Sequence, residues 1–350
     1  MANFHTLRVS QIKRLTPKAV AISFDIPEAL KSTFSFSAGQ YITLKKTLQG
    51  EDIRRAYSIS SAPTAEQITI GVKKVEGGAF SSYANSELKE GDMLEVMPPE
   101  GRFVFEPTET AKTIAAFAAG SGITPIMSIA RTVLEKHPES TFVLTYGNQS
   151  VEETMFASEI AALQATYPDR FHTHFIHSRT REEDSLFGRI DDSTVNYVLK
   201  NKHNGLAFDA FYLCGPEEMI KVVEKGLSDN GTPQEIVHFE LFTAATETVP
   251  TPPAASEGET AIEVVVDDET FSFTMDQKML VLDAVLKENI DAPYSCQGGV
   301  CSSCIAKVTE GKAEMVKNQI LTDAEIADGF ILTCQAHATT PTLKVDYDDV

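Results

Sequence analysis

The chain has 350 residues, 42% of them hydrophobic, and a formal net charge of −20 at neutral pH. This length predicts two or three domains, the hydrophobic content excludes a wholly disordered chain, and the acidic charge argues against nucleic-acid binding. No apolar run reaches the about 18 residues that a transmembrane helix needs. The N-terminal stretch is typical of an alternating strand rather than a signal peptide. We therefore expect a cytoplasmic protein without a membrane span.

Residues 1–108 contain short strand-like runs that are separated by turn residues. Many short strands punctuated by Gly and Pro are typical of an antiparallel β-barrel. The predicted strands lie at 5–15, 19–26, 39–48, 54–61, 67–75 and 92–101.

Residues 109–243 instead alternate apolar strands with helical stretches. This rhythm predicts an α/β domain with a parallel sheet. His172 and His174 share one face of the third strand, but no Cys or carboxylate spacing supports a metal site there, and we interpret them as ordinary strand residues. The predicted strands are 112–120, 141–148, 171–178 and 210–216, and the predicted helices are 125–137 and 152–167.

Residues 244–259 are rich in Pro and Ala and predict an extended linker. Residues 260–350 predict a small α+β domain with a hairpin turning at Asp267–Glu269 and a helix at 279–290. Residues 251–350 hold ten Asp and eight Glu against six Lys and no Arg, a net charge of −12. Such a surface suits a basic protein partner, although acidic surfaces also simply keep proteins in solution.

Three of the five cysteines stand close together. The spacing C-x4-C-x2-C with a distant fourth cysteine is that of a plant-type [2Fe–2S] cluster, whereas zinc usually takes two C-x2-C pairs and only one is present. Backbone N–H groups of the intervening loop can stabilise the charge of the thiolates. The predicted ligands are Cys296, Cys301, Cys304 and Cys334.

The segment RRAYSIS at 54–60, followed by G-x-x-S at Gly78–Ser81, resembles the flavin-binding motifs of the ferredoxin–NADP reductase superfamily. The resemblance implies that Arg55 pairs with a phosphate, that Tyr57 faces the isoalloxazine ring, and that the Ser58 hydroxyl bonds near flavin N5. Related reductases with this domain order use FMN, but a helix start at Gly78 suits the pyrophosphate of FAD. The implied flavin contacts are Arg55, Ala56, Tyr57, Ser58, Val72, Lys73, Gly78, Phe80 and Ser81.

The turn from Gly120 to Pro125 departs from G-x-G-x-x-G because proline replaces the third glycine. The resulting sequence resembles the glycine turn of the same superfamily. We expect Thr124 to be the N-cap and Pro125 the first residue of the following helix. The resemblance places Cys214 beside the nicotinamide, although a lone Cys there would more often be a buried structural residue. The catalytic candidates are Ser58, Cys214 and Glu240. The resemblance also implies that Phe242 belongs to a segment that closes over the flavin. The implied nicotinamide-binding residues are Gly120, Gly122, Ile123, Thr124, Pro125, Cys214, Gly215 and Pro216.

Ser178 and Arg179 follow the strand at 171–178 and resemble the 2′-phosphate site of NADPH enzymes. A guanidinium suits a phosphate because its forked donors meet two oxygens. Neighbouring acidic residues at 182–184 would neutralise Arg179 if it were only a solvated loop residue. We expect NADPH, with NADH as the alternative.

The domain order resembles the reductase components of multicomponent oxygenases. This family implies electron transfer from NADPH through FAD and [2Fe–2S] to an oxygenase or hydroxylase partner. The likeness is greatest to reductases of the phenylacetyl-CoA epoxidase type from phenylacetate degradation, and steroid hydroxylase reductases share the layout. Two alternatives stay open: an autonomous ferredoxin–NADP reductase-like enzyme, and a redox sensor or electron carrier.

Overall fold

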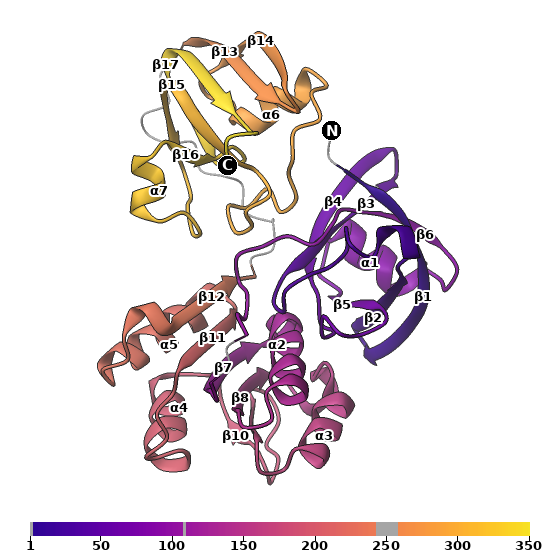
Figure 1. The fold of residues 1–350 in the computed structure, drawn as a ribbon, viewed down its shortest axis with the longest axis vertical. Helices are drawn as coiled ribbons and strands as arrows, with labels where there is room; N and C mark the ends of the chain where they lie inside the picture. Colours follow the sequence, from indigo (N-terminus) through magenta and orange to yellow (C-terminus); the bar gives the residue numbers. More distant parts are fainter. Residues whose placement is uncertain (1–2, 108–109, 243–257) are drawn as a thin grey trace. The chain divides into compact units, whose positions relative to one another are not determined.

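A computed structural model describes residues 3–107, 110–242 and 258–350, which form two compact units (Figure 1). The larger unit contains His5–Ile53 and Tyr57–Phe242. The smaller unit contains residues 258–350 together with residues 3–4 and 54–56. The predicted linker 244–259 lies outside the described residues except at its last two positions, and the predicted domain limits stay predictions.

The first sheet of the larger unit has six strands in the order β4-β3-β6-β1-β2-β5. Strand β1 pairs antiparallel with β2 and β6, and β2 pairs antiparallel with β5, as predicted for a barrel-like domain. Apolar side chains such as Phe24, Ile42 and Ile70 are fully buried inside it. Its strands are β1 (His5–Thr16), β2 (Ala19–Asp25), β3 (Tyr41–Leu48), β4 (Glu51–Ser58), β5 (Ile68–Lys73) and β6 (Met93–Val96).

The second sheet of the larger unit is parallel and has the order β10-β9-β8-β7-β11-β12. Strands β8, β9 and β10 are added in turn on one side of β7, and β11 and β12 are added on its other side. The strand order therefore reverses between β7 and β11. The strands are β7 (Thr113–Ala119), β8 (Thr141–Asn148), β9 (Phe171–His177), β10 (Leu186–Phe187), β11 (Ala210–Gly215) and β12 (Val237–Leu241).

Helices connect these parallel strands and pack against them. Helix α2 (Ile123–Lys136) contacts β7, β8 and β11, and α5 (Glu217–Asp229) contacts β11 and β12. Shorter helices are α1 (Ala79–Ser86), α3 (Ala157–Thr166) and α4 (Asp192–Asn196), and α4 continues into a π-helix at Tyr197–Lys202. The predicted α/β rhythm is confirmed.

Helix α3 begins later than the sequence indicates. Helical residues were expected from position 152, but a 3₁₀ turn at Val151–Glu153 comes first and Phe156 has a left-handed backbone with φ of 58°. The turn buries Met155 and Phe156 against β5, where a Cβ added to Gly71 would lie 3.1 Å from both side chains. Burial of these two side chains therefore overrides helix propensity at this point.

Hydrogen bonds and ion pairs join the barrel to the parallel-sheet part inside the larger unit. The Ser128 hydroxyl of α2 donates to the Ser61 carbonyl at 2.7 Å, and Arg131 donates to the Ser60 carbonyl at 2.9 Å. Lys18 of the barrel also pairs with a glutamate before α3 at 2.8 Å. Helix α2 and the residues before α3 are thus held against the barrel.

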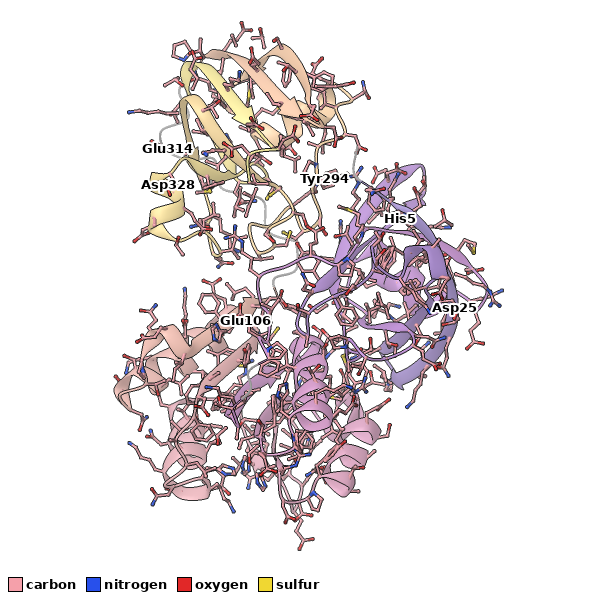
Figure 2. The ribbon with its side chains drawn as sticks, in the orientation of Figure 1. His5, Asp25, Glu106, Tyr294, Glu314 and Asp328 are labelled. Carbon is pink, nitrogen blue, oxygen red and sulfur yellow. The ribbon has the colours of Figure 1, made fainter. Side chains whose placement is uncertain are left out.

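The smaller unit has a five-stranded sheet in the order β14-β13-β17-β15-β16, and α6 packs on β17. Two left-handed residues, Asp267 and Asp268, turn the chain between β13 and β14, so the predicted hairpin is confirmed. Figure 2 labels Glu314 and Asp328 among the acidic side chains of this unit. Its elements are β13 (Glu259–Val266), β14 (Glu269–Asp276), α6 (Val281–Lys287), β15 (Ile305–Met315), α7 (Asp323–Ala327), β16 (Phe330–Leu332) and β17 (Ala336–Asp346).

Candidate functional site

The reversal of strand order between β7 and β11 locates the candidate site of the larger unit. In open parallel sheets, ligands bind outside the carboxyl ends of strands at the point where the strand order reverses. The Gly120–Gly122 turn follows β7, and Cys214 and Gly215 end β11. The sequence-predicted nicotinamide residues therefore converge at the expected edge of the sheet.

The glycine turn packs directly against the end of β11. A Cβ added to Gly122 would lie 2.1 Å from the carbonyl oxygen of Cys214, so only glycine fits there. Gly120 adopts a left-handed φ of 56°, which glycine reaches without steric cost. The hydroxyl of Tyr146, a fully buried residue of β8, donates to the Gly120 carbonyl at 2.9 Å. Tyr146 was not predicted as a site residue, since its only sequence signal is an aromatic ring two positions before the end of β8.

The predicted helix start at Thr124 and Pro125 is wrong. Helix α2 begins at Ile123, with Gly122 as its N-cap. The Thr124 hydroxyl donates back to the Ser121 carbonyl at 3.0 Å from inside the first turn. The glycine turn is itself a 3₁₀ turn that runs straight into the helix, and this moves the start upstream.

Ser58, Cys214 and Glu240 meet at the end of β11. Strands β11 and β12 place Cys214 opposite Glu240, and the Ser58 hydroxyl donates to Glu240 Oε2 at 3.1 Å. Burial raises the pKa of the half-buried Glu240 to about 8, although the hydrogen bond from Ser58 opposes this. Burial, and then the nearby Glu240, raise the pKa of the fully buried Cys214 thiol well above its usual value. The three predicted catalytic candidates therefore form one group.

Three further predicted site residues, Phe242, Pro216 and Lys73, lie on elements next to the group formed by Ser58, Cys214 and Glu240. Phe242, with its N–H bonded to the Gly215 carbonyl at 3.2 Å, follows β12, and Pro216 caps α5. Lys73 at the end of β5 pairs with Glu153 at 3.5 Å, and its Nζ lies 3.8 Å from the Cβ position of Gly120.

The flavin-motif residues lie on β4, β5 and α1. The rings of Tyr57 and Phe80 are 5.5 Å apart, and Gly78 is the N-cap of α1. The Ser81 hydroxyl accepts from the Val75 N–H at 3.1 Å and donates to the Gly78 carbonyl at 3.2 Å. This hydroxyl therefore braces the turn before the helix.

Two further flavin candidates belong to the part of β4 that clusters with the smaller unit. These are Arg55 and Ala56, which are both half-buried. The Arg55 guanidinium donates to the carbonyl of its neighbour Arg54 at 2.7 Å. Val72 of β5 is fully buried, and its carbonyl accepts from the Asn85 amide at 3.2 Å.

Ser178 and Arg179 follow β9 at the carboxyl edge of the parallel sheet. Their N–H groups donate to the carbonyls of Asn148 and Gln149 at 3.0 and 2.9 Å, which fixes the backbone of this loop. Both side chains are exposed, but Arg181 stacks on the Phe187 ring at 4.5 Å. Arg179 is therefore the better placed of the two arginines for an anionic ligand.

The histidines of β9 have a partner that the sequence did not indicate. His174 and His203 place their Nε2 atoms 2.8 Å apart, a hydrogen bond in which one ring donates and the other accepts. Burial is the largest cause that lowers the pKa of His174 to about 4, and burial also lowers the pKa of His203, so both rings favour the neutral form at neutral pH. His203 lies 29 residues further along the chain, and no local sequence pattern could have linked it to His174.

In the smaller unit the four predicted ligand cysteines come together. Cys301, Cys304 and Cys334 are buried and Cys296 is partly exposed. Hydrogen bonds from Cys301 and Cys334 lower the pKa of Cys296 well below its usual value, and the Gly298 N–H adds another at 3.3 Å. The same contacts raise the pKa of Cys301 and of Cys334.

This sulfur group fits a cluster whose thiolates receive backbone N–H donors. Among residues 3–107, 110–242 and 258–350, no group of three or more His, Cys, Asp or Glu side chains is arranged to hold a metal ion, so the assignment of the four cysteines to a cluster rests on their spacing and mutual contacts. A [2Fe–2S] cluster divides its four thiolates between two irons.

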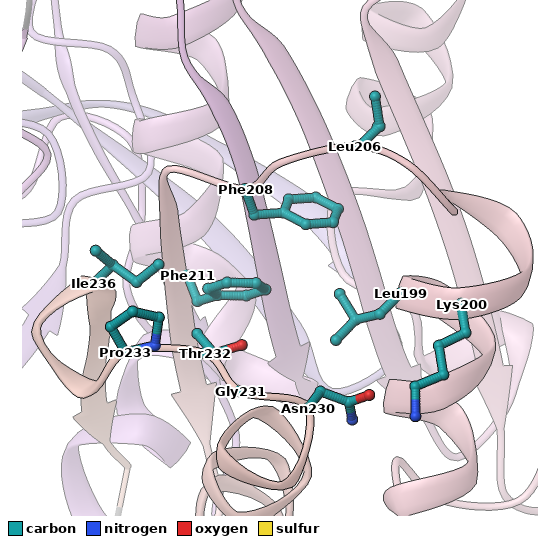
Figure 3. Close-up of a pocket in the computed structure, with 10 residues that line it drawn as sticks. All are labelled: Leu199, Lys200, Leu206, Phe208, Phe211, Asn230, Gly231, Thr232, Pro233 and Ile236. Carbon is teal, nitrogen blue, oxygen red and sulfur yellow. The ribbon is translucent and has the colours of Figure 1, made fainter.

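A cavity of about 350 Å³ lies at the opposite edge of the parallel sheet (Figure 3). Phe208 and Phe211, with ring centres 5.3 Å apart, stand at the amino end of β11, and Ile236 precedes β12. The cavity is therefore separate from the group around Cys214, which lies at the carboxyl end of the same strand.

Across the described part of the chain, the helices are too short or too polar to cross a bilayer.

Three family models match the chain in succession. Residues 6–105 match the oxidoreductase FAD-binding domain, 117–225 the oxidoreductase NAD-binding domain, and 264–339 the 2Fe-2S iron-sulfur cluster binding domain. The predicted cofactors FAD, a nicotinamide nucleotide and [2Fe–2S] are thereby confirmed at the level of domains.

Curated relatives and solved structures share this layout. The chain is 38% identical to a subunit of the 1,2-phenylacetyl-CoA epoxidase of Escherichia coli, over 99% of both chains. It is 31% identical to the ferredoxin reductase component of 3-ketosteroid-9-alpha-monooxygenase of Rhodococcus rhodochrous, over 97% of this chain and 96% of that one. A phthalate dioxygenase reductase structure has the same fold, with a TM-score of 0.64 and 23% identity over 98% of both chains.

Motifs, fold and relatives agree from the flavin barrel to the cysteine loop. The chain therefore belongs to the flavin- and [2Fe–2S]-containing oxidoreductases that include this phenylacetyl-CoA epoxidase component and the ferredoxin reductase components of monooxygenases.

Proposed function

We propose that this chain is a cytoplasmic, NADPH-dependent reductase that supplies electrons to an oxygenase of the phenylacetyl-CoA epoxidase type. The observation that carries this proposal is the 38% identity to the E. coli epoxidase component over 99% of both chains. The relative from the 3-ketosteroid monooxygenase favours a second candidate, the reductase of another hydroxylase. An autonomous reductase with a soluble acceptor is the third.

The chemistry of the larger unit starts from two uncharged groups at the end of β11, Glu240 and Cys214. When bound, FAD accepts a hydride from NAD(P)H, and a [2Fe–2S] cluster carries electrons one at a time. At neutral pH the Glu240 carboxyl keeps its proton because its pKa is about 8. The Ser58 hydroxyl, which donates to Oε2, orients this carboxyl. The high pKa of Cys214 keeps its thiol neutral as well.

These neutral groups have two consequences for the nucleotide. A protonated Glu240 does not repel an anionic dinucleotide at the end of β11, as an ionised Glu240 would. The protonated carboxyl also has an O–H donor, which an ionised Glu240 lacks. We therefore assign Glu240 the role of holding a proton and Ser58 the role of orienting the Glu240 carboxyl. Cys214 would pack as a neutral thiol beside the nicotinamide.

The nucleotide itself would rest on the carboxyl edge of the parallel sheet. The N–H groups at the start of α2 and the partial positive charge of that helix end suit a pyrophosphate. The exposed Arg179 guanidinium supports a 2′-phosphate and hence NADPH. In the smaller unit, Cys296, Cys301, Cys304 and Cys334 are proposed to hold the cluster.

The test uses a reconstituted E. coli phenylacetyl-CoA epoxidase in which this chain replaces its homologous component, and it follows NADPH-dependent epoxide formation. We expect product with the wild type. Cys334→Ser should lose product formation and the cluster's visible absorption, while reducing ferricyanide at the wild-type rate. Rapid ferricyanide reduction by the wild type without any product would exclude the epoxidase partner and favour another acceptor.

A further inference from the structure

We infer that Gln335, the residue after the last proposed cluster ligand, positions that ligand and donates a hydrogen bond that raises the reduction potential of the cluster. The inference rests on the proposed ligand set and adds a residue to it. Gln335 is only 2% exposed, and its side-chain amide faces the cysteine loop.

The Gln335 amide nitrogen meets three acceptors. It lies 2.7 Å from the Cys334 carbonyl oxygen, 3.1 Å from the Gln297 carbonyl oxygen and 3.8 Å from Cys334 Sγ. All three neighbours accept hydrogen bonds, so the nitrogen rather than Oε1 must point toward them. The orientation of this amide is therefore set by its surroundings.

One side chain thus ties the two ends of the ligand set together. Gln297 follows the first ligand, Cys296, and has a left-handed backbone with φ of 53°, which is unfavourable for a residue with a side chain. The hydrogen bond from Gln335 holds its carbonyl in that conformation. In the same loop the Gly298 N–H donates to Cys296 Sγ at 3.3 Å, so the conformation also directs a donor at the first ligand.

The loop closes over the Gln335 side chain. A Cβ added to Gly299 would lie 3.0 Å from Gln335 Cγ and 3.2 Å from the Lys317 carbonyl oxygen, and the φ of Gly299 is 70°. A glycine is required here because any larger residue would push the loop off the amide. The Gln335 side chain is thereby enclosed, with only 2% of it exposed.

The contact between the Gln335 amide and Cys334 Sγ should raise the reduction potential of the cluster. Two N–H hydrogens serve three acceptors, so the sulfur shares one of them in a three-centre bond. A thiolate ligand accepts more strongly than a thiol, and reduction of the cluster adds negative charge to its sulfurs. A donor at Cys334 therefore stabilises the reduced cluster more than the oxidised one.

The experiment compares Gln335→Met with Gln277→Met in the full chain. Methionine keeps the volume and removes the amide. Gln277 is a matched control in the same unit, since it is 4% exposed and its amide nitrogen bonds Thr260 Oγ1 at 3.0 Å and the Thr340 carbonyl at 3.3 Å. Iron and sulfide content, the midpoint potential of the cluster, and the rate of iron loss to a chelator are measured for both variants.

We expect Gln335→Met to move the midpoint potential to more negative values, by about a twofold to fivefold change in the reduction equilibrium, as one weak hydrogen bond supports. Iron loss should accelerate about fivefold. Gln277→Met should leave the potential unchanged while lowering thermal stability. Failure of Gln335→Met alone to retain a cluster would also support its positioning role.

An unchanged or more positive potential in Gln335→Met would overturn the inference, as would equal shifts in both variants. Failure of the ligand assignment has a different signature, because Cys334→Ser would then keep its full iron and sulfide content.

Discussion

Glu240 carries a proton at a pH where most glutamates have lost theirs. Its pKa of about 8 in the folded chain lies well above the about 4.3 of an unfolded glutamate. Between these values the folded protein holds a proton that the unfolded chain has released. The stability contributed by this group is therefore complete below about pH 4 and decreases as the pH rises toward 8.

Glu240→Gln should remove this pH dependence, because an amide has no proton to lose. We expect the melting temperature of the variant, relative to wild type, to increase between about pH 6 and about pH 9. Scanning calorimetry at several pH values measures this difference. A constant difference over the range would show that the carboxyl titrates normally in the folded protein.

In the proposed NADPH site, the exposed guanidinium of Arg179 contacts the 2′-phosphate and so determines which nucleotide the site prefers. A charge-assisted contact contributes roughly 1.5–3 kcal/mol, so Arg179→Ala should lower kcat/KM for NADPH by about ten- to a hundredfold. kcat/KM for NADH should stay within about twofold. Arg181→Ala is the matched control, since Arg181 stacks on Phe187. A wild type that prefers NADH, or equal losses with both nucleotides, contradicts the assignment.

At the scale of elements, the turn between β7 and α2 depends on close packing. Gly122→Ala would place a methyl group 2.1 Å from the Cys214 carbonyl oxygen, so the turn or the end of β11 must move. Displacements of this size are costly at reacting centres, and we expect kcat/KM for NADPH to fall by about tenfold to a hundredfold. Ser121→Ala changes the same turn without adding volume and should retain activity. Wild-type kinetics in Gly122→Ala would refute the close contact.

The junction between the barrel and the residues before α3 relies on ion pairs at its edge. Lys18 donates to Glu153 at 2.8 Å and, as the largest of several causes, lowers the pKa of that carboxyl. The stabilisation is present above the unfolded pKa of about 4.3 and disappears as the pH falls through the lower folded value. Glu153→Gln should cost about 0.5–1 kcal/mol near pH 7 and progressively less as the pH falls below about 4.3, with a smaller cost near pH 3.

Urea unfolding at the two pH values tests the Glu153 prediction. Glu217→Gln, which breaks the pair within α5 between Glu217 and Lys221, provides the comparison. That pair joins no two parts of the unit and should cost less. A Glu153→Gln penalty that persists at acid pH would point to lost packing instead of lost charge.

Most elements were predictable because their signals are local. The strand β8 matches its predicted run residue for residue, since a continuous apolar run bounded by polar residues marks a buried parallel strand. The cysteine spacing and the glycine turn are equally local. The late start of α3, the pairing of His174 with His203 and the amide of Gln335 were not predictable in this way. Each depends on a contact between distant residues, which periodicity and spacing do not encode.

At the scale of the whole molecule, the two units have separate cores. The core of the smaller unit includes Cys304 and Cys334, whereas the fully buried Cys214 belongs to a core of the larger unit. Because ligand binding stabilises only the structure that contains the site, removal of the cluster should lower the melting temperature of the smaller unit alone. Calorimetry before and after chelation, with flavin absorbance marking the larger unit, measures this. A matching shift in the flavin-reported transition would show that the units unfold together.

The presence of both units on one chain also fixes the kinetic order of electron delivery inside the molecule. Transfer from the larger unit to the smaller one within a chain is unimolecular, because the two units are covalently joined, so its rate does not depend on the amount of protein. Dilution leaves this step unchanged, whereas delivery to a separate protein slows in proportion to concentration. A dilute sample should therefore accumulate electrons on the chain, and the second-order encounter with its acceptor should determine the rate at which they leave.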